Sequence, residues 1–488
     1  MSRFTRGLAP LRHRGFRLLA GGQLASNVGD AAYAVALPWY VLATHGGALL
    51  LGTVLAAYGV PRTVTLLAGG QASDRWRPWT VMMGSDLVRV LATGGLAVAA
   101  AAGPARAVIL VPIAIVLGAG EGMFLPGSFA IIPALLPDAD LQAGNALSSA
   151  GTQLATLAGP ALGGAMVALL GPAPAFGLDA ASFAVSALTL AGIRAAQRPA
   201  AHTNTAATTP LSPATADATG PADGTAPGAP APTPAGAPGA HPAGPEPGTP
   251  ATVRAVLRSE RALQVALVIT IVANLGSGGM DGVALPSLAH GPLHTGAGGF
   301  GALVAAFGAG ALLGTLVAAH VRRARRPAIA GSVAFLAEAV FMTLVPYLGG
   351  PIGAAAMLVG FGAMNGFGNV TTITAFQRWA PADMLGRLSA VLMVASVGVY
   401  PISVLLGGAV VHTWGPAVFF PLAAAALAVA ILGGLTQRSW RDFGVVTPVA
   451  SEAGLTDPAT GDPATGDSAT DNPGPGTTPA IGTVRYTS

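Results

Sequence analysis

Long apolar stretches fill most of this sequence and leave it few folds to adopt. A helix needs about 20 apolar residues to cross a hydrocarbon core. Stretches of about that length or more lie at residues 16–43, 50–68, 79–102, 107–134, 145–170, 174–196, 262–289, 298–319, 328–348, 352–377, 388–411 and 415–436. Their length, and the lack of the alternation typical of a membrane-spanning strand, predict an all-α polytopic membrane protein with twelve transmembrane helices.

Composition agrees with a chain that lies mostly in lipid. The 488 residues are 52% hydrophobic and only 9% charged, whereas soluble domains carry about 25% charged residues. Cysteine is absent, which excludes disulfides, thiolate metal sites and cysteine nucleophiles. Lysine is absent too, so a Gly-Lys-Ser/Thr phosphate loop cannot form and ATP-driven pumping by this chain is excluded. We expect no enzyme activity, metal or cofactor, since no Ser/His/Asp set or metal-binding histidine spacing is found.

Arginine supplies every basic side chain apart from histidine, and the arginines cluster in alternate loops. The loops on one side hold Arg106 alone, and those on the other side hold Arg3, Arg6, Arg12, Arg14, Arg17, Arg194, Arg198, Arg254, Arg258, Arg261, Arg322, Arg323, Arg325 and Arg326. Because arginine-rich loops stay in the cytoplasm, we expect both termini to lie in the cytoplasm. The basic charge follows topology and does not indicate a nucleic-acid partner. The first stretch is too long for a signal peptide, and we expect it to be retained.

Changes in composition divide the chain into five segments. We expect a cytoplasmic N-terminus at 1–15, six-helix bundles at 16–197 and 253–437, a linker at 198–252 and a tail at 438–488. The linker consists mainly of Ala, Pro, Thr and Gly and cannot bury enough apolar surface to fold. The tail repeats Asp-Pro-Ala-Thr-Gly and is of low complexity. Linker and tail are therefore predicted to be disordered and cytoplasmic.

The two halves of the chain repeat each other. The segment that begins at Gly118 resembles the one that begins at Gly362, 244 residues later. The same separation relates Pro137 to Pro381, Gly163-Gly164 to Gly407-Gly408, and Gly171-Pro172 to Gly415-Pro416. Near the start the separation drifts slightly, between Asn27 and Asn274 and between Pro38 and Pro286. A shared spacing over this length predicts two parallel six-helix repeats.

A polar segment, Gly69–Arg77, separates the second and third apolar stretches. It resembles the G-x-x-x-D-R-x-G-R-R/K motif of the major facilitator superfamily. Gly70, Asp74 and Arg75 match the motif, whereas Arg77-Pro78-Trp79 departs from its basic end. The resemblance covers about residues 16–436 and implies two bundles around a central substrate path.

The surroundings of this motif narrow the resemblance. Pro61-Arg62 and the segment Ser85–Arg89 are similar to the bacterial efflux branch that contains the enterobactin exporter and macrolide-efflux-like proteins. This implies a bacterial plasma-membrane protein. Asp86 and Arg89 are three residues apart on one helix face and can pair. We interpret them as a cytoplasmic lock together with Asp74 and Arg75.

Acids inside the membrane are the candidates for chemistry, because a charge there is costly unless it borders water or has a partner. Asp30 and Glu121 lie in helices that line the cavity in the resembled family. Their expected role is reversible protonation or binding of a cationic substrate group. The alternative is a structural carboxyl bonded to Ser26 or Asn27. Arg62 is either the counter-charge of one acid or extends towards the cytoplasm.

The second half holds fewer acids. Asp281 lies mid-way along the seventh predicted helix and is a further candidate for proton coupling or substrate binding. Glu338 is expected to face the periphery or another helix. Asp179 is expected to cap the sixth helix.

The fifth predicted helix contains Gly159-Pro160 followed by Gly163-Gly164. This resembles a facilitator motif associated with exchangers, with Ala155 in place of its first glycine. The proline bends the helix and the small residues allow close packing. We expect the bend to seal the cytoplasmic path against proton leak; ordinary packing is the alternative.

These features favour a secondary transporter that exports a small amphiphilic molecule, such as an antibiotic or siderophore, in exchange for protons. The expected partners are this substrate, protons and the lipid bilayer, with a monomer as the working unit. An uncoupled facilitator or importer of a small metabolite is one alternative. A sensor or scaffold of the same fold that does not transport is another.

Overall fold

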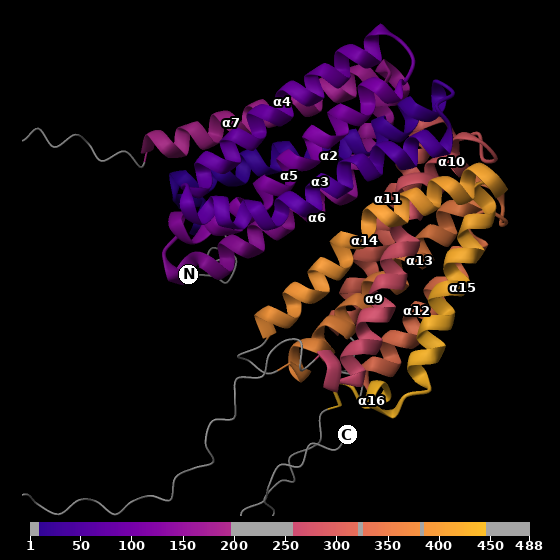
Figure 1. Ribbon diagram of the computed structural model, residues 1–488. Coiled ribbons are helices and arrows are strands. Elements are labelled where there is room, and N and C mark those ends of the chain that lie inside the picture. The colour runs from indigo at the N-terminus through magenta and orange to yellow at the C-terminus, as the bar shows by residue number, and fades with distance from the viewer. Residues whose placement is uncertain (1–8, 197–256, 321–325, 381–384, 446–488) are drawn as a thin grey trace, which may run out of the picture.

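The computed structural model describes residues 9–196, 257–320, 326–380 and 385–445, and in these residues every regular element is a helix (Figure 1). The first bundle comprises η1 (Ala9–Arg12), α2 (Arg14–Ala43), α3 (Gly47–Arg75), α4 (Pro78–Ala102), α5 (Ala107–Leu135), α6 (Asp138–Leu170) and α7 (Pro172–Ala196). The second comprises α9 (Arg261–Gly279), the π-helical turn η2 (Met280–Ala284), α10 (Leu285–His290), α11 (Gly296–His320), α12 (Pro327–Leu344), α13 (Gly350–Trp379), α14 (Leu385–Trp414), α15 (Pro416–Leu435) and α16 (Arg438–Arg441).

Eleven helices of the described residues are long and apolar enough to cross a membrane, with α9, η2 and α10 counted as one span. The remaining long helix of the first bundle, α2, has 30 residues, contains Arg14, Arg17 and Asp30, and is not among these eleven. It packs along α6 and α7 inside the first bundle. The prediction of an all-α polytopic fold is therefore confirmed, and the eleven spans together with α2 agree with two repeats of six helices.

The repeat is visible in the backbone as well as in the sequence. His45 and His294 have positive φ angles of 63° and 46°, in the turns before α3 and α11. Gly171 and Gly415 both have φ of 85°, in the turns before α7 and α15. Positive φ is uncommon for residues with a side chain, so its recurrence at matching turns marks a true duplication.

Both bundles hold one helix pair together in the same way. A Cβ on Gly118 or Gly122 of α5 would overlap backbone carbonyls of α3, and Thr65 bonds the Ala119 carbonyl at 3.1 Å. Gly362 and Gly366 of α13 pack equally closely on α11. Small residues permit such contact between membrane helices. This packing fixes the positions of the residues between Gly118 and Gly122 and between Gly362 and Gly366.

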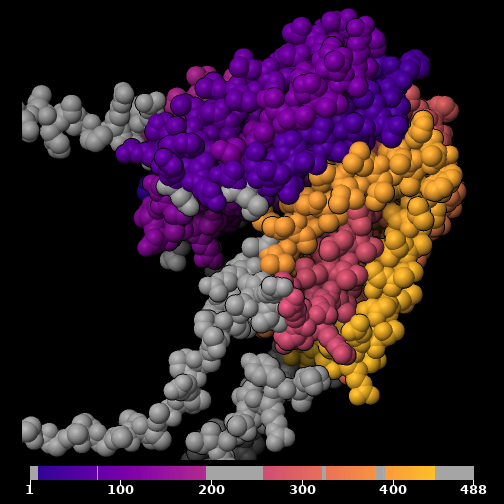
Figure 2. Space-filling model, viewed as in Figure 1, coloured from indigo at the N-terminus to yellow at the C-terminus, as the bar shows by residue number. Residues whose placement is uncertain are grey.

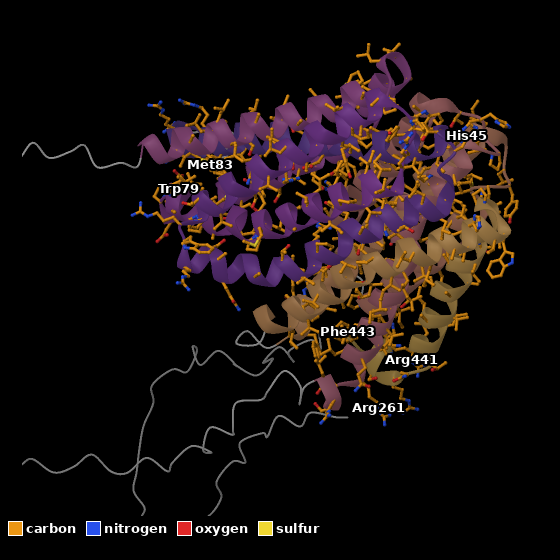
Figure 3. The ribbon with its side chains drawn as sticks, turned by 45° about the horizontal axis from the view of Figure 1, so that its top comes forward. His45, Trp79, Met83, Arg261, Arg441 and Phe443 are labelled. Atoms are coloured by element: carbon orange, nitrogen blue, oxygen red, sulfur yellow. The ribbon has the colours of Figure 1, made fainter. Side chains whose placement is uncertain are left out.

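The two bundles meet at one end and separate towards the other (Figures 1 and 2). The closed end carries the turns after α2, α4, α6 and α10. The open end carries the start of α2 and the turn between α3 and α4. In Figure 3, His45 lies at the closed end, whereas Trp79, Arg261 and Arg441 lie at the open end.

Two contacts between glycines join the bundles near the closed end. Gly52 of α3 faces Gly408 of α14, where a Cβ on either would lie 3.2–3.3 Å from the Cα of the other. Gly164 of α6 faces Gly301 of α11, where the corresponding distance is 2.9 Å both ways. Side chains larger than hydrogen do not fit at these crossings without movement.

The polar segment between the second and third spans is shorter than predicted. Helix α3 continues through Arg75, so only Trp76 and Arg77 lie between it and α4. Gly69 packs against α5, whereas a Cβ on Gly70, the residue that matches the motif, would meet nothing within 4 Å. The side chain of Asp74 lies outside the described residues.

The start of the predicted tail folds against the second bundle. Trp440 is buried, stacks on Phe443 and donates a hydrogen bond from Nε1 to Ser332 Oγ at 3.0 Å. The linker 198–252 and residues 446–488 of the tail lie outside the described residues.

Candidate functional site

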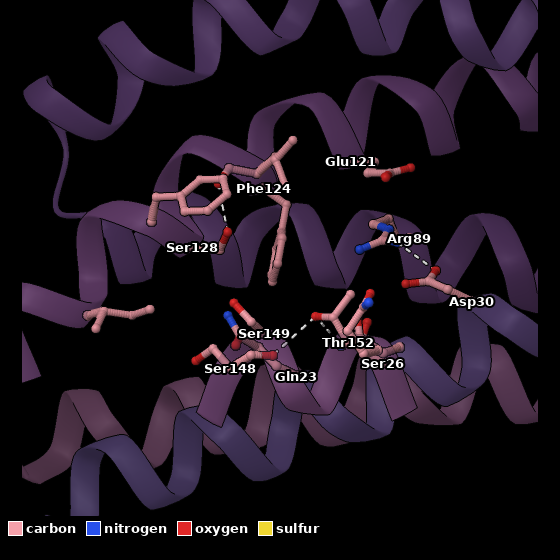
Figure 4. Close-up of a pocket in the computed structure, with 15 residues that line it drawn as sticks. Gln23, Ser26, Asp30, Arg89, Glu121, Phe124, Ser128, Ser148, Ser149 and Thr152 are labelled. Atoms are coloured by element: carbon pink, nitrogen blue, oxygen red, sulfur yellow. Dashed lines mark hydrogen bonds and ion pairs between the residues drawn. The ribbon is translucent and has the colours of Figure 1, made fainter. Parts of the chain in front are cut away.

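A cavity of about 420 Å³ lies inside the first bundle, and Figure 4 shows the residues that line it. Four helices contribute its polar wall: Gln23, Ser26, Asn27 and Asp30 of α2, Arg89 of α4, Glu121 of α5, and Ser148, Ser149 and Thr152 of α6. Phe124 of α5 projects between them (Figure 4). A chamber of this size with polar and apolar walls suits a small molecule.

Asp30 is the acid of α2 that faces this cavity. Arg89 donates a hydrogen bond from Nη2 to Asp30 Oδ1 at 2.9 Å (Figure 4). The side chain of Asp30 is 45% exposed, whereas that of Arg89 is 5% exposed. The arginine therefore neutralises Asp30 from behind and leaves part of the carboxylate open to the cavity.

Glu121 pairs with Arg62. The two side chains lie on α5 and α3, and Arg62 Nη2 is 3.1 Å from Glu121 Oε1. Close packing at Gly118 and Gly122 brings these helices together. Of the two alternatives for Arg62, the structure places it as a counter-charge.

Arg89 lies in a tight cage. Its guanidinium carbon is 3.8 Å from the centre of the Phe183 ring, which favours a cation. A Cβ on Gly120 would lie 2.9 Å from Arg89 Cγ, so this glycine leaves room for the arginine. On its other side Nη1 is 3.8 Å from Oδ1 of Asp86, which is fully buried.

The structure brings Asp86 and Arg89 to Asp30, and not to the end of α3. Arg89 lies eleven residues beyond the first residue of α4, or about 16 Å along the helix from the turn. Arg75 is exposed at the end of α3. In this conformation Arg89 therefore does not form the expected cytoplasmic lock with Asp74 and Arg75. It pairs with Asp30 instead.

Asp281 faces a cavity that both bundles line. This cavity, of about 390 Å³, is bordered by Asp30 and Thr156 from the first half and by Asp281 and Phe307 from the second. Asp281 also borders a cavity of about 490 Å³ within the second bundle. The two expected acids of the first and seventh spans thus share one chamber between the halves.

The π-helical turn that carries Asp281 explains the drift in the repeat. Asn27 and Asn274 are 247 residues apart, whereas Pro38 and Pro286 are 248 apart. One extra residue has entered the second copy between these points, and η2 absorbs it there. Such turns occur often at functional sites. The drift was therefore a signal in the sequence for this site.

The two remaining buried acids lie away from the cavities' exposed walls. Glu338 Oε1 accepts a hydrogen bond from Asn365 Nδ2 at 3.2 Å, so Glu338 faces another helix and not the periphery. Asp179 is 2% exposed and packs against Gly29 of α2. It lies seven residues after the first residue of α7. The prediction that Asp179 caps this helix is wrong, because the apolar length of the span hid where the helix begins.

The Gly-Pro motif of α6 lies at the bundle interface. Pro160 borders the shared cavity, and Gly159 and Gly163 pack against Ala31 and Ala32 of α2. Gly164 makes the contact with α11 near the closed end. In this conformation the last glycine of the motif contributes to the closed end, and a role of the motif in sealing the opposite end stays a prediction.

Charges away from the helix ends are unevenly divided in the described residues. The first half holds Asp30, Asp86, Glu121 and Asp179 with two bases, Arg62 and Arg89, whereas the second holds only Asp281 and Glu338. Among the residues that the structure describes, no group of His, Asp and Glu is suited to a metal ion.

Two bundles around acid-lined cavities are accompanied by a family match over most of the chain. The model of the Major Facilitator Superfamily matches residues 19–391. This chain belongs to the Major Facilitator Superfamily. The resemblance that the polar segment and the repeat indicated is confirmed.

Curated relatives include drug exporters. The "Multidrug efflux pump Tap" of Mycolicibacterium fortuitum is 31% identical over 183 residues, which are 36% of this chain and 44% of the pump. The pump of the same name from Mycobacterium tuberculosis (strain ATCC 25618 / H37Rv) is 30% identical over 183 residues, 36% of this chain and 43% of the pump. The match therefore spans less than half the length of these relatives.

Solved structures share the fold at low sequence identity. A POT family transporter in complex with 5-aminolevulinic acid has a TM-score of 0.61 and 13% identity, and covers 87% of this chain and 96% of its own. A bacterial homologue of the iron transporter ferroportin, in an inward-facing state, has a TM-score of 0.60 and 13% identity, with coverage of 88% and 98%. These likenesses establish the architecture alone.

Proposed function

We propose that this chain is a secondary active exporter that exchanges protons for a small cationic amphiphile at a bacterial plasma membrane. The observation that carries the proposal is the shared cavity in which Asp30 and Asp281 face the same space from opposite halves. Partly neutralised carboxylates in a low-dielectric chamber attract either a proton or an organic cation. The efflux pumps among the relatives support export.

The conformation supports a binding step from the cytoplasm. Arginines gather at the open end, at the start of α2 and α9 and at the end of α3. Positively charged ends stay in the cytoplasm, so the open end is inward-facing. A cation that enters from that side reaches Asp30 and Glu121 before it meets the closed end.

Protons and substrate compete in the proposed cycle. Asp30 and Glu121 take up protons when the protein is open to the outside, because the pH is lower there. They give these protons up to the inside, where Asp30 pairs with Arg89 and Glu121 with Arg62, and the ionised acids then attract a cation from that side. Because the halves rock as units around the cavity, the contacts at Gly164 and Gly408 must open for release.

The test is transport of ethidium by purified protein in liposomes with an imposed pH gradient. Glu121→Gln removes the acid but keeps its shape, and it leaves Arg62 unpaired beside the cavity. We expect pH-driven transport to fall at least about tenfold, the equivalent of about 1.4 kcal/mol, with the protein still folded. Glu338→Gln, in a buried acid of the second bundle outside the shared cavity, is the matched control and should transport normally.

Different outcomes separate the alternatives. Transport by the Glu121→Gln variant at the wild-type rate would contradict the proposed proton exchange. Wild-type transport that persists after an uncoupler collapses the gradient would identify an uncoupled facilitator. Absence of any transport by well-folded protein, over a panel of organic cations, would favour a sensor or scaffold.

A further inference from the structure

Behind the cavity, the first bundle encloses two acids that the proposed exchange has not used. Asp86 of α4 is fully buried, and within the described residues Ser186 of α7 lies beside it but is not placed to donate a well-aligned hydrogen bond to either carboxylate oxygen. Asp179 of α7 is 2% exposed, and its Oδ1 has no hydrogen-bond partner. Buried polar groups nearly always have hydrogen-bond partners. Two buried carboxyls with unpartnered oxygens, close to the ion pair of Arg89 with Asp30, therefore require an explanation.

Counting charges around Arg89 supplies part of that reason. Asp30 on α2, Asp86 on α4 and Asp179 on α7 all interact with this arginine, and Ser186 of α7 lies beside Asp86. The other base, Arg62 of α3, is paired with Glu121 of α5. Three ionised acids around one arginine would leave two uncompensated charges in the membrane interior, which is costly. While Arg89 bonds Asp30, therefore, Asp86 and Asp179 hold protons.

The guanidinium of Arg89 reaches two of these acids from its two ends. Nη2 bonds Asp30 at 2.9 Å, and Nη1 lies 3.8 Å from Asp86. A charge-assisted bond needs about 2.7–2.9 Å, so a shift of about one ångström would complete the second pair. The face of Phe183 lies 3.8 Å from the guanidinium and keeps a cation stabilised throughout such a shift.

We propose that Asp86 is the second partner of Arg89 and the group that releases a proton when a cation binds Asp30. This inference rests on the proposed function and deepens it. The cation forms an ion pair with Asp30, and the bond between Arg89 and Asp30 breaks. Arg89 then pairs with Asp86, whose O–H bond breaks, and the proton leaves past Arg89 into the cavity that Arg89 and Asp30 line. One positive charge enters and one leaves, so the site stays neutral.

Asp179 is not the second partner of Arg89. Its Oδ1 points at Gly29, where a Cβ would lie only 2.6 Å away. Within the described residues Asp179 forms no ion pair, whereas Asp86 already lies within 4 Å of the arginine. Asp179 therefore keeps its proton as Arg89 moves.

The experiment measures proton release and binding together. Tetraphenylphosphonium, a cation with no proton of its own, is titrated into purified full-length protein in weakly buffered detergent with a pH indicator. We expect the wild type to release about one proton for each cation bound near neutral pH. Asp86→Asn keeps the shape of the side chain but has no proton to give. Its release should fall to nearly zero, with binding weaker by about tenfold.

A second variant separates a missing proton from a damaged protein. Arg89→Gln combined with Asp86→Asn leaves Asp30 without a cation, so Asp30 itself takes a proton. Binding of tetraphenylphosphonium must then displace that proton, and release should return to about one. Glu338→Gln is the matched control, a buried acid of the second bundle, and should behave as the wild type.

Three results would overturn the inference. The first is wild-type release by the Asp86→Asn variant, and the second is no recovery of release in the double variant. The third is loss of release in Asp179→Asn, which would assign the proton to Asp179. Failure of the wild type to bind any tetraphenylphosphonium would be a different result, because it would remove the proposed cation site itself and this inference with it.

Discussion

Gly69 and Gly70 are neighbours in α3, yet only Gly69 faces another helix. A Cβ on Gly69 would lie 2.9 Å from the carbonyl oxygen of Gly122 and 3.0 Å from Cα of Met123, both backbone atoms of α5. A Cβ on Gly70 would meet nothing within 4 Å. Backbone atoms cannot rotate out of the way as a side chain can. The pair therefore offers two substitutions in one helix turn with opposite expected effects.

We expect Gly69→Ala to destabilise the first bundle, because α3 and α5 must move apart to admit the methyl group. Overpacking of this kind costs about 1–3 kcal/mol. Gly70→Ala should be neutral or stabilising by about 0.5–1 kcal/mol, because alanine favours the helix. Thermal unfolding in detergent measures both. A lower midpoint for Gly70→Ala than for Gly69→Ala would contradict the packing of α3 on α5.

At the same scale, the pairing of charges shows what the sequence could not predict. It identified Asp30, Glu121 and Arg62, because a charge in an apolar stretch is conspicuous. It did not predict that Arg89 bonds Asp30. Which face of a helix points inwards is read from amphipathicity, and these helices are apolar on every side. Their rotation is set by contacts such as Gly120 against Arg89, which depend on the packed structure.

Among the elements, the π-helical turn distinguishes the second bundle from the first. Residues before the turn follow the register of α2 at a separation of 247, and residues after it at 248. In the first register Asp281 corresponds to Ala34, which borders the shared cavity. In the second register it corresponds to Tyr33, which packs on Phe176 of α7. Deletion of one residue in η2 should convert the π-helical turn into a regular α-helical turn. The position of the deletion then decides whether Asp281 takes the register of Ala34 or that of Tyr33.

Deletion of Gly282 leaves Asp281 in the register of Ala34, facing the cavity. Deletion of Met280 moves Asp281 into the register of Tyr33, facing its own bundle. Both variants have the same length, and α2 shows that a helix without the extra residue is stable in this fold. We expect tetraphenylphosphonium affinity to fall about tenfold in the Met280 deletion, as in Asp281→Asn, and to persist in the Gly282 deletion. Equal affinities in the two deletions would show that the direction of Asp281 is irrelevant.

The positions of the helices could be predicted from the sequence, but the residues at which they end could not. Apolar length placed the spans correctly, since bilayer thickness sets it. It misplaced their polar ends, as at Gly69–Arg75, because a helix can continue past the hydrocarbon core into water. The same limit hid Asp179 inside α7.

For the whole molecule, the glycine contacts near the closed end join the two bundles at two equivalent crossings. Gly52 and Gly301 occupy matching positions in α3 and α11, each on the sixth residue of its helix. Their partners, Gly408 and Gly164, are 244 residues apart in the repeat. The same glycine–glycine contact therefore occurs twice at the closed end, each time between a helix of one repeat and a helix of the other.

Filling these two positions should open the closed end. A Cβ on Gly301 would overlap the Pro160 carbonyl, and one on Gly52 would lie 2.6 Å from the Val404 carbonyl oxygen. Each wedge should cost the closed conformation about 1–3 kcal/mol, and every 1.4 kcal/mol shifts the equilibrium about tenfold. We therefore expect Gly52→Ala with Gly301→Ala to raise the population of a state that is open at the closed end.

The lack of cysteine in the chain makes this measurable with one label. Thr156→Cys lies in the shared cavity and should react with an impermeant maleimide faster from the open end than from the closed end in the parent protein. In the double-alanine variant the same cysteine should react from the closed-end side, in vesicles of the opposite orientation. Gly177→Ala, where a Cβ would meet nothing within 4 Å, is the matched control in α7. An unchanged labelling rate from the closed-end side in the double variant would show that these crossings do not hold the gate, and equal rates from the two sides in the parent would show that the closed end is not sealed.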